Sequence, residues 1–307
     1  MKIKTLIIGA GNISAFYDSP HHNEVLTHAH AIINNNKFEL IGFVDIDIEK
    51  AQTAAKIWGG EAFNSIDEVS VKIDCVCIAV PDKYHFQVTQ MVIEYAPKII
   101  IIEKPIAIDA TEGKALMDLI DGKPIHIEVN YSRRFITGFS QMKAELPMFG
   151  KLLGGTVLYG KGLLHNGSHM VNLLLYFLGQ ISMKSILGGV EDYHIQDCSK
   201  EVVYEINGAD IIFQPVDSRF LTIFEFDLRF SKGRIKYDGS SEKLHFYDVD
   251  NSPIYLGEQI YIYRKTLDIS ASEAMINLYL HISNVIEGKA SCISSAEDAY
   301  KTLLLCK

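Results

Sequence analysis

The chain has 307 residues, of which 48% are hydrophobic and 22% charged, a profile typical of a globular protein long enough for two domains. Its formal net charge of -9 argues against nucleic acid as a partner, because nucleic-acid affinity depends largely on Lys and Arg side chains that neutralise phosphates. A small anionic ligand is compatible with this charge.

Neither a membrane span nor a secretion signal is expected. No segment reaches the roughly 18 consecutive apolar residues of a transmembrane helix, and the apolar run at the N-terminus is short and meets Gly9 at once. The five cysteines are odd in number, and Cys75 and Cys77 lie two apart in an expected strand. This pattern favours buried thiols over a disulfide or a zinc site, and we expect a reducing, cytoplasmic location.

The first expected strand covers residues 2–8 and runs into the sequence Gly-Ala-Gly-Asn-Ile-Ser, residues 9–14. This matches the glycine-rich turn of a dinucleotide-binding fold, with serine in place of the last glycine. Gly9 would make the turn, and Gly11 would let the backbone at Asn12 and Ile13 approach a pyrophosphate. The motif is weak evidence by itself, because glycine-rich turns are common.

A second strand over residues 38–44 ends at Asp45, where a carboxylate can accept hydrogen bonds from the adenosine ribose. The distance from the glycine-rich turn exceeds the usual separation of about 20 residues. We attribute the excess to a loop at residues 18–23, inserted before a helix that Thr27 caps.

Four histidines fall in this region and suggest two interpretations: His21, His22, His28 and His30. Either the four form a metal cluster, or two of them lie together in a loop and the other two lie on different faces of a helix. We favour the second interpretation, and expect no metal, because no cysteine or clear carboxylate completes a ligand set.

Two further buried strands follow, over residues 74–80 and 98–102. The first ends at Pro81, before a helix containing His85, and the second is a run of isoleucines followed directly by charged residues. Glu103 and Lys104 therefore stand at the carboxyl end of a parallel strand, the edge of an open α/β sheet where ligands bind. The alternative is an ordinary solvated turn.

A helix through residue 120, capped by Asp109 and Glu112, completes the first half. The alternation of strands and helices predicts a doubly wound parallel sheet, an α/β Rossmann dinucleotide-binding domain over residues 1–124. The second half predicts an α+β domain with a large, mostly antiparallel sheet over residues 125–289. We expect the C-terminal helix, about residues 290–307, to pack back on the first domain.

Within the second half, helices are expected over residues 137–146, from His165 to Gly179, and over 272–286 and 295–306. Strands are expected over residues 125–131, 154–159, 201–206, 211–216, 220–230, 233–237 and 243–249.

Several motifs, in this order, resemble those of the Gfo/Idh/MocA family of NAD(P)-dependent sugar and inositol oxidoreductases: Gly9-Ala-Gly11, Asp45, Ala79-Val-Pro81 with His85, and Glu103-Lys-Pro105. Gly167-Ser-His169 is similar to the family's second motif, which precedes a leucine-rich helix. The resemblance implies a cofactor site that includes Ala79, Pro81, His85, Glu103 and Lys104. It also implies a cis peptide bond between Lys104 and Pro105.

The chain departs from the family around His169. The family often has aspartate four residues before this histidine and another three residues after it, where this chain has His165 and Asn172. A carboxylate beside a histidine holds its tautomer and raises its pKa, so the loss of both favours Lys104 over His169 as the main proton-transfer group.

The resemblance implies an NAD-dependent dehydrogenase acting on the CH–OH group of a sugar, nucleotide sugar or inositol. Lys104 would exchange the hydroxyl proton, with His169 beside it. The candidates for orienting the substrate are Tyr131, Arg133, His165 and Asn172, although Tyr131 and Arg133 are equally compatible with surface positions at a strand end. The alternative function is a dinucleotide-binding sensor or regulator of the same fold without turnover.

NAD is expected in preference to NADP. No arginine occurs before Arg133, so the first domain lacks the side chain best suited to bind a 2′-phosphate bidentately. Asp45 would repel that phosphate, and Lys50 is the one plausible cation nearby.

We further expect a homo-oligomer, a dimer or tetramer, through the open face of the second-domain sheet. Helices can cover one face of that sheet, and Leu221 and Ile223 would lie with Glu225 on the other.

Overall fold

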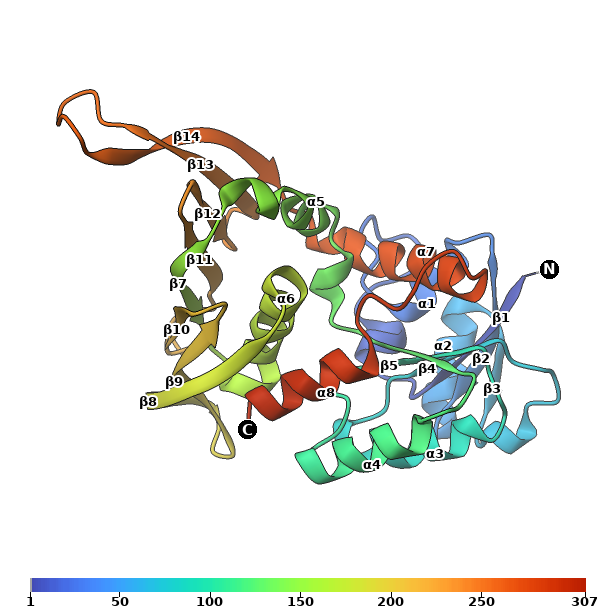
Figure 1. The fold of residues 1–307 in the computed structure, drawn as a ribbon. Coiled ribbons are helices and arrows are strands. Elements are labelled where there is room, and N and C mark those ends of the chain that lie inside the picture. The colour runs from blue at the N-terminus through green and yellow to red at the C-terminus, as the bar shows by residue number, and fades with distance from the viewer. Residues whose placement is uncertain (1) are drawn as a thin grey trace. The chain divides into compact units, whose positions relative to one another are not determined.

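The computed structural model describes residues 2–307, which form two compact units (Figure 1). The first unit comprises the chain as far as Phe135 together with Ser272–Leu304. The second comprises Ile136–Ala271 and Leu305–Lys307. These boundaries differ from residues 124 and 289, because the strand expected after residue 124 joins the first sheet and the helix after Ser272 packs on it.

The first unit is built on a parallel sheet of six strands in the order β3-β2-β1-β4-β5-β6. Its strands are β1 Ile3–Ile8, β2 Phe38–Val44, β3 Glu61–Phe63, β4 Cys75–Ile78, β5 Ile99–Ile102 and β6 His126–Val129. Its helices are α1 His28–Ile33, α2 Ile48–Trp58, α3 His85–Ile93, α4 Ala110–Ile120, α7 Ala274–Ile286 and most of α8 Ala296–Leu305. The Rossmann-type sheet predicted from the sequence is confirmed.

The isoleucine run forms β5, a strand in the interior of this sheet. All four isoleucines of β5 are fully buried, as expected for a parallel strand covered on both faces. Helices α1 and α7 lie side by side and share one hydrophobic core with α2 (Figure 1). Asp109 caps α4 by accepting a hydrogen bond from the backbone N–H of Glu112, as predicted.

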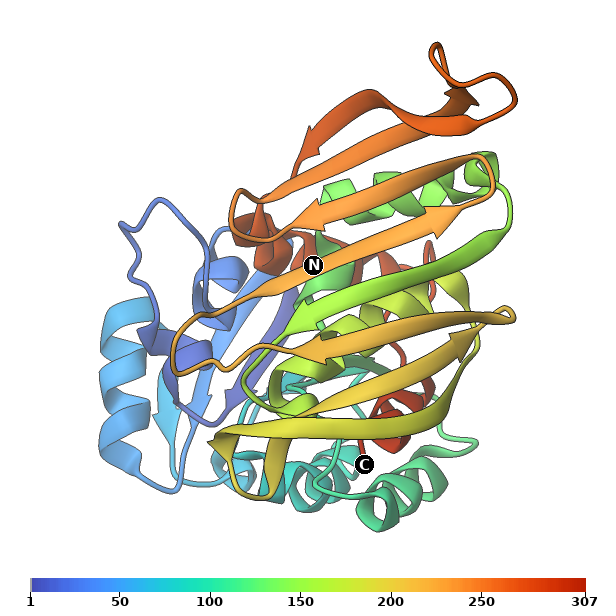
Figure 2. The same cartoon turned by 90° about the vertical axis from the view of Figure 1, so that its left-hand side faces the viewer.

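The second unit contains a sheet of eight strands in the order β14-β13-β12-β11-β7-β10-β9-β8, antiparallel except between β7 and β10. The strands are β7 Leu152–Tyr159, β8 Ile181–His194, β9 Asp197–Ile206, β10 Ala209–Pro215, β11 Phe224–Phe230, β12 Gly233–Asp238, β13 Lys243–Asn251 and β14 Gln259–Asp268. Helices α5 Thr137–Glu145 and α6 Ser168–Leu178 cover one face, and Figure 2 shows the other face without helices. The predicted mostly antiparallel sheet is confirmed.

Aromatic side chains fill the space between the helices and this sheet. Phe139 of α5, Phe177 of α6 and Phe226 of β11 are in mutual ring contact. Because side chains alternate along a strand, Phe226, Leu228 and Phe230 share this buried side of β11.

Short helical turns connect many of these elements. They are η1 Asn12–Phe16, η2 Ile66–Glu68, η3 Asp82–Tyr84, η4 Ser132–Phe135, η5 Leu146–Phe149, η6 Gly162–Gly167 and η7 Ala271–Glu273. In the described residues 2–307, no helix has the length and apolar composition needed to cross a membrane. All five cysteines are free thiols.

Two expectations about the second sheet are wrong. The sequence did not predict β8 or β14, and Leu221 and Ile223 do not share a strand with Glu225. The chain turns at Asp217, whose carbonyl oxygen accepts hydrogen bonds from the backbone N–H groups of Phe220 and Leu221. Strand β11 therefore begins only at Phe224.

Candidate functional site

The register of the first sheet aligns the ends of its strands. Ile8 pairs with both Val44 and Ile78, Ile78 pairs with Ile102, and Ile102 pairs with Val129. The residues that follow these strands therefore emerge at one edge, and they are Gly9, Asp45, Ala79, Glu103 and Asn130. Four of these five residues were chosen as site candidates from the sequence, and the parallel register brings them to the same edge.

The glycine-rich turn after β1 has no room for a side chain at its first position. Gly9 has a φ of +96°, and a Cβ there would lie 2.6 Å from the carbonyl oxygen of Ala79. A Cβ on Gly11, in contrast, would meet no heavy atom within 4 Å, so space remains open beside it. The Ser14 hydroxyl donates to the carbonyl oxygen of Gly9, and the serine that replaces the motif's last glycine thus closes the turn.

The helix that follows this turn is short. Asn12 and Ile13 lie in the single π-helical turn η1, and the chain forms an irregular loop before α1 starts at His28. The predicted insertion is confirmed, and so is the helix cap, because the Thr27 hydroxyl accepts a hydrogen bond from the backbone N–H of His30.

Asp45 joins the ends of β1 and β2. One carboxylate oxygen accepts a hydrogen bond from the backbone N–H of Ala10 at 2.7 Å, and the other accepts one from the N–H of Asp47 at 2.9 Å. Carboxylate oxygens accept more than one hydrogen bond each, so Asp45 keeps acceptor capacity beside the glycine-rich turn. Lys50 lies 3.5 Å from the Asp47 carboxylate.

His85 connects the ends of β4 and β5. It is fully buried, and its Nδ1 and Nε2 lie 2.7 Å and 2.9 Å from the carbonyl oxygens of Pro105 and Val80. Pro81 precedes η3 in the same turn, and the Lys104–Pro105 peptide is cis, as predicted. The ring of His85 therefore ties two turns of the edge together, and direct contact with a cofactor remains a prediction.

Glu103 points into a buried polar network that the sequence analysis missed. Its Oε1 accepts hydrogen bonds from His28 Nε2 at 2.9 Å and from Asn130 Nδ2 at 2.6 Å. His28 Nδ1 lies 3.0 Å from the Tyr279 hydroxyl of α7. Burial alone would raise the pKa of Glu103, but the hydrogen bonds and charges of its neighbours outweigh burial and lower the pKa. No local sequence pattern pairs His28 with Glu103, because the two residues are 75 positions apart.

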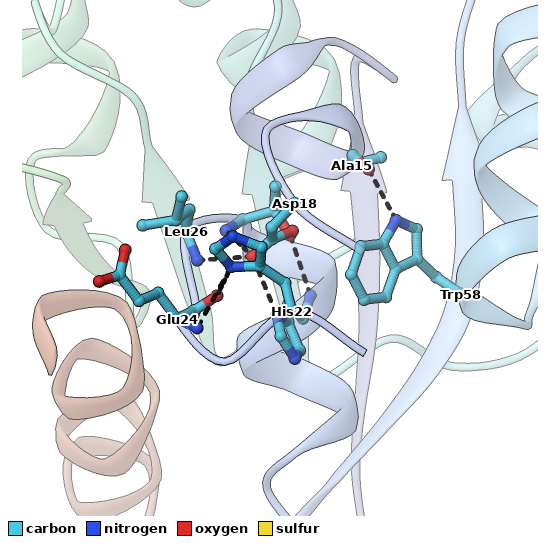
Figure 3. Close-up of polar contacts among 8 residues, drawn as sticks. Ala15, Asp18, His22, Glu24, Leu26 and Trp58 are labelled. Carbon is cyan, nitrogen blue, oxygen red and sulfur yellow. Dashed lines mark hydrogen bonds and ion pairs between the residues drawn. The ribbon is translucent and has the colours of Figure 1, made fainter. Parts of the chain in front are cut away.

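A second carboxylate holds the inserted loop (Figure 3). The Asp18 side chain accepts hydrogen bonds from the backbone N–H groups of Leu26 and Thr27, from the Thr27 hydroxyl and from His30 Nδ1, at 2.6 to 3.1 Å. Burial would raise the pKa of Asp18, but these hydrogen bonds outweigh burial and lower it. The His30 ring packs on Trp58, whose Nε1 donates to the carbonyl oxygen of Ala15.

Three of the four histidines of this region thus have separate contacts. His28 contacts Glu103, His30 contacts Asp18, and His22 contacts the backbone of Glu24 (Figure 3). Over residues 2–307, no group of three or more His, Cys, Asp or Glu side chains is arranged to hold a metal ion.

The substrate-orienting candidates of the first unit follow β6. Tyr131 is buried, and Arg133 is partly buried in η4. The neighbouring Arg134 is buried and donates both to the carbonyl oxygen of Ile293 and to Asp298. Arg134 therefore serves to hold the segment before α8.

The second unit carries the histidine motif at the start of α6. His169 is partly buried in the first turn of α6, and Asn172 is fully buried one turn later. The helix ends at Gly179, where φ is +85°, as predicted. His165 is exposed in η6, and its ring stacks on Tyr193 with centroids 4.4 Å apart.

Two aspartates at the end of the β8–β9 hairpin hold the turn before this motif. Asp197 accepts hydrogen bonds from the backbone N–H groups of Leu164 and His165, both at 2.8 Å. Asp192 accepts from the N–H of Lys161 and from the Ser199 hydroxyl. Neither aspartate lies four residues before or three residues after His169, where the family often has one, so the motif did not predict this role.

The edge of the first sheet fits a dinucleotide. It offers an open backbone position at Gly11 and a carboxylate with remaining acceptor capacity at Asp45. Residues 3–131 also match the family model GFO_IDH_MocA, an oxidoreductase family with an NAD-binding Rossmann fold. The N-terminal part of this chain is thus similar to the NAD-binding domain of that family.

Relatives and solved structures extend this result. Glucose-6-phosphate 3-dehydrogenase of Bacillus subtilis is 25% identical over 138 residues, 45% of this chain and 36% of the relative. Two solved structures match nearly the whole chain. One is a proposed NADPH-dependent oxidoreductase of Desulfitobacterium hafniense, with a TM-score of 0.83 and 14% identity over 100% of this chain and 94% of the other. The second is UDP-N-acetylglucosamine 3-dehydrogenase of Acidithiobacillus ferrooxidans, with a TM-score of 0.77 and 18% identity over 99% and 95% of the chains. The alignments with curated relatives span less than two thirds of those proteins.

The Asp18 network predicts a pH-dependent loss of stability in Asp18→Asn. The asparagine cannot accept all four hydrogen bonds, so the free energy of unfolding should fall by about 2 kcal/mol near neutral pH. Because the folded-state pKa of Asp18 is lowered, its contribution is present above the unfolded value of about 4 and is lost as the pH falls through the folded value. The difference between the two proteins should therefore shrink in acid.

Urea unfolding across the acid range measures this difference. Asp118→Asn is the control, because Asp118 is an exposed helix residue paired with Lys114, and its loss should cost less than about 0.5 kcal/mol. A difference for Asp18→Asn that is independent of pH would show that the carboxylate charge does not hold the loop.

Proposed function

We propose that the protein is an NAD-dependent dehydrogenase or reductase that moves a hydride between a sugar-like CH–OH carbon and nicotinamide, with Lys104 as the proton-transfer group. The observation that carries the proposal is the position of Lys104 two residues after the end of β5, at the strand edge that also presents Gly9 and Asp45. Two of the similar proteins described above are named as 3-dehydrogenases of sugar derivatives. These names support a phosphorylated or nucleotide-linked sugar as substrate.

The first unit would hold the cofactor through the residues that line this edge. The backbone at Gly9, Gly11, Asn12 and Ile13 would receive the pyrophosphate, and Asp45 would accept hydrogen bonds from the ribose hydroxyls. Around the nicotinamide, the proposed contacts are Ala79, Pro81, His85, Glu103 and Lys104. A bound nicotinamide supplies the hydride chemistry that no protein side chain provides.

Lys104 would move the proton that accompanies the hydride. A lysine is ordinarily protonated at neutral pH and can donate its Nζ proton when a ketone is reduced, whereas it must be deprotonated to accept the hydroxyl proton in the oxidation. His169 would assist Lys104, and the candidates for orienting the sugar are Tyr131, Arg133, His165 and Asn172. The cytoplasm is the proposed location.

The rival function is a dinucleotide-binding sensor that does not turn over substrate. Incubation of the purified protein with NAD and a panel of sugars, sugar phosphates, nucleotide sugars and inositols separates the two, with reduced nicotinamide followed by absorbance. NAD binding without reduction on any member of the panel would favour the sensor.

With the best substrate of that panel, Lys104→Met should lower turnover by about 10²-fold or more, the range that general acid–base groups supply, with NAD binding little changed. His169→Asn should cost less, because His169 is proposed only to assist. Lys98→Met is the matched control, since Lys98 lies at the opposite end of β5 and pairs with Asp74 on the surface. If His169→Asn abolishes turnover while Lys104→Met retains it, the two residues have the opposite roles.

NAD should bind more tightly than NADP. Arg134 is occupied by Asp298, Lys50 lies beside the Asp47 carboxylate, and Asp45 would repel a 2′-phosphate. The D. hafniense structure is described as NADPH-dependent, so the preference needs a direct test. Fluorescence titration with NADH and NADPH measures the two affinities, and Asp45→Asn should bring the two affinities closer together. Tighter binding of NADP by the unaltered protein would contradict the prediction.

The protein should form a homo-oligomer through the open face of its second sheet and the projecting β13–β14 hairpin. This hairpin continues past the pairing with β12 (Figure 1). It exposes Ile260 and Ile262 of β14 and a tip of Ile254, Tyr255 and Leu256. Apolar patches of this kind mark association surfaces. Light scattering at micromolar concentration should give the molar mass of a dimer or tetramer. Ile262→Lys should lower this mass toward that of the monomer, whereas Met91→Lys on α3 should leave it unchanged. A monomeric mass for the unaltered protein would refute the expectation.

A further inference from the structure

Strand β8 of the second unit carries a bulge close to its end. The regular pairs on either side of the bulge are Val190 with Ser199 and His194 with Asp197. Between these pairs, residues 191–193 of β8 stand opposite Cys198 of β9 alone. A bulge breaks the alternation of side chains along a strand, and bulges often re-aim a side chain beside a functional site. Here two successive residues of β8, Asp192 and Tyr193, both contact the turn before α6.

Asp197, the first residue of β9, holds the backbone of η6. Its two carboxylate oxygens accept hydrogen bonds from the N–H groups of Leu164 and His165, both at 2.8 Å. Gly162 has a φ of +78°, and a Cβ there would lie 2.3 Å from Asp197 Oδ2, so the chain passes the carboxylate at a position that only glycine suits. Hydrogen bonds to a charged acceptor are stronger than those to a neutral one. The backbone of His165 is thereby fixed against the hairpin.

The ring of His165 lies against the same hairpin. It stacks on the ring of Tyr193, with the centroids 4.4 Å apart and the planes 18° from parallel. The Tyr193 hydroxyl lies 3.4 Å from His165 Nδ1, which is longer than the usual hydrogen-bond range, so the ring stack is the main contact between the two side chains. Two residues of one hairpin therefore hold His165, Asp197 through its backbone and Tyr193 through its ring.

Asp192 holds a different part of this turn. Its carboxylate is buried and accepts hydrogen bonds from the Lys161 N–H, the Ser199 hydroxyl and the Ser218 N–H, at 2.8 to 3.1 Å. These donors come from three separate segments, and His165 is not among them. Asp192 is thus a carboxylate of the same hairpin that supports the turn without binding His165, which makes it a matched control.

We propose that Tyr193 and Asp197 are positioning residues for His165: together they hold its imidazole in the orientation in which it contacts the sugar. The proposal rests on the function proposed above, in which His165 is a candidate for orienting the substrate. The stacked pair is open to solvent, since Tyr193 is 52% exposed and His165 is also exposed. A side chain that is already held in its binding orientation loses less conformational entropy when the ligand binds. Without the hairpin contacts, sugar binding would have to order more of the His165 side chain.

The orientation of the ring can be measured without substrate. In a carbon-13 NMR spectrum of the histidine rings, the signal that is missing in His165→Asn identifies His165. Stacking on Tyr193 should move the ring protons of His165 upfield, because they lie over the face of another aromatic ring. This upfield shift should disappear in Tyr193→Leu and should remain in Tyr193→Phe, which keeps a ring at this position. Because Tyr193 is exposed, neither substitution disturbs the core.

The two aspartates separate positioning from general support of the turn. Asp197→Asn should reduce the upfield shift of His165, because an amide can accept only one of the two N–H groups that the carboxylate binds. Asp192→Asn should leave the shift in place. An upfield shift that persists in Tyr193→Leu would overturn the proposal, and equal effects of the two asparagine variants would refute the role of Asp197.

Kinetics tie the orientation of His165 to substrate binding. With an active substrate, Tyr193→Leu should raise the KM for the sugar about 5-fold, within the range for loss of an aromatic pair, and should change kcat and the KM for NAD little. Tyr193→Phe should keep the KM of the unaltered protein. Ile195→Ser is the control, because Ile195 is 79% exposed in the turn of the same hairpin, and it should also leave the KM unchanged.

The two measurements together separate the role of the hairpin from the proposed function. If the protein reduces no NAD on any substrate while Tyr193→Leu abolishes the upfield shift, the proposed function is refuted and the hairpin still orients His165. If Lys104→Met loses turnover while Tyr193→Leu leaves the KM for the sugar unchanged, the role of the hairpin alone is refuted.

Discussion

The parallel register of the first sheet is the constraint on which the candidate site depends. Because Ile8, Val44, Ile78, Ile102 and Val129 pair in one row, the chain leaves each strand at the same edge. Residues that are up to 121 positions apart, from Gly9 to Asn130, thus become neighbours without any direct sequence signal between them. The hydrophobic burial of β4 and β5 fixes this register, since a slipped strand would move the following residue away from the edge.

Buried or partly buried carboxylates hold loops within each of the two units. Asp18 fixes the inserted loop before α1, and Glu103 ties the turn after β5 to α1 through His28. In the second unit, Asp192 and Asp197 hold the turn before α6 in the same way. In each case a charged acceptor satisfies donors that the loop cannot pair within itself, and such hydrogen bonds are among the stronger ones in proteins.

Histidine serves mainly as a connector in the first unit. His28, His30 and His85 are all buried, and each joins a segment to another that is distant in the sequence or in a different turn. An imidazole has two ring nitrogens on opposite sides, so it can join two polar groups across a core where a single hydroxyl would reach one. The Glu103-Lys104-Pro105 turn is thus bound by two fully buried histidines, His28 at Glu103 and His85 at Pro105.

The sequence by itself determined the two fold classes, the glycine-rich turn and the cap at Thr27, and the resemblance to a known family implied the cis peptide after Lys104. These features depend on local patterns: hydrophobic runs, a glycine where a side chain would clash, and motifs of fixed spacing. Tertiary structure alone decided that His28 meets Glu103 and Tyr279, that β6 and α7 belong with the first sheet, and that Asp192 and Asp197 hold the turn before His169. These contacts join residues separated by up to 251 positions, and no local propensity encodes such a pairing, because it depends on how helices and strands pack after they form.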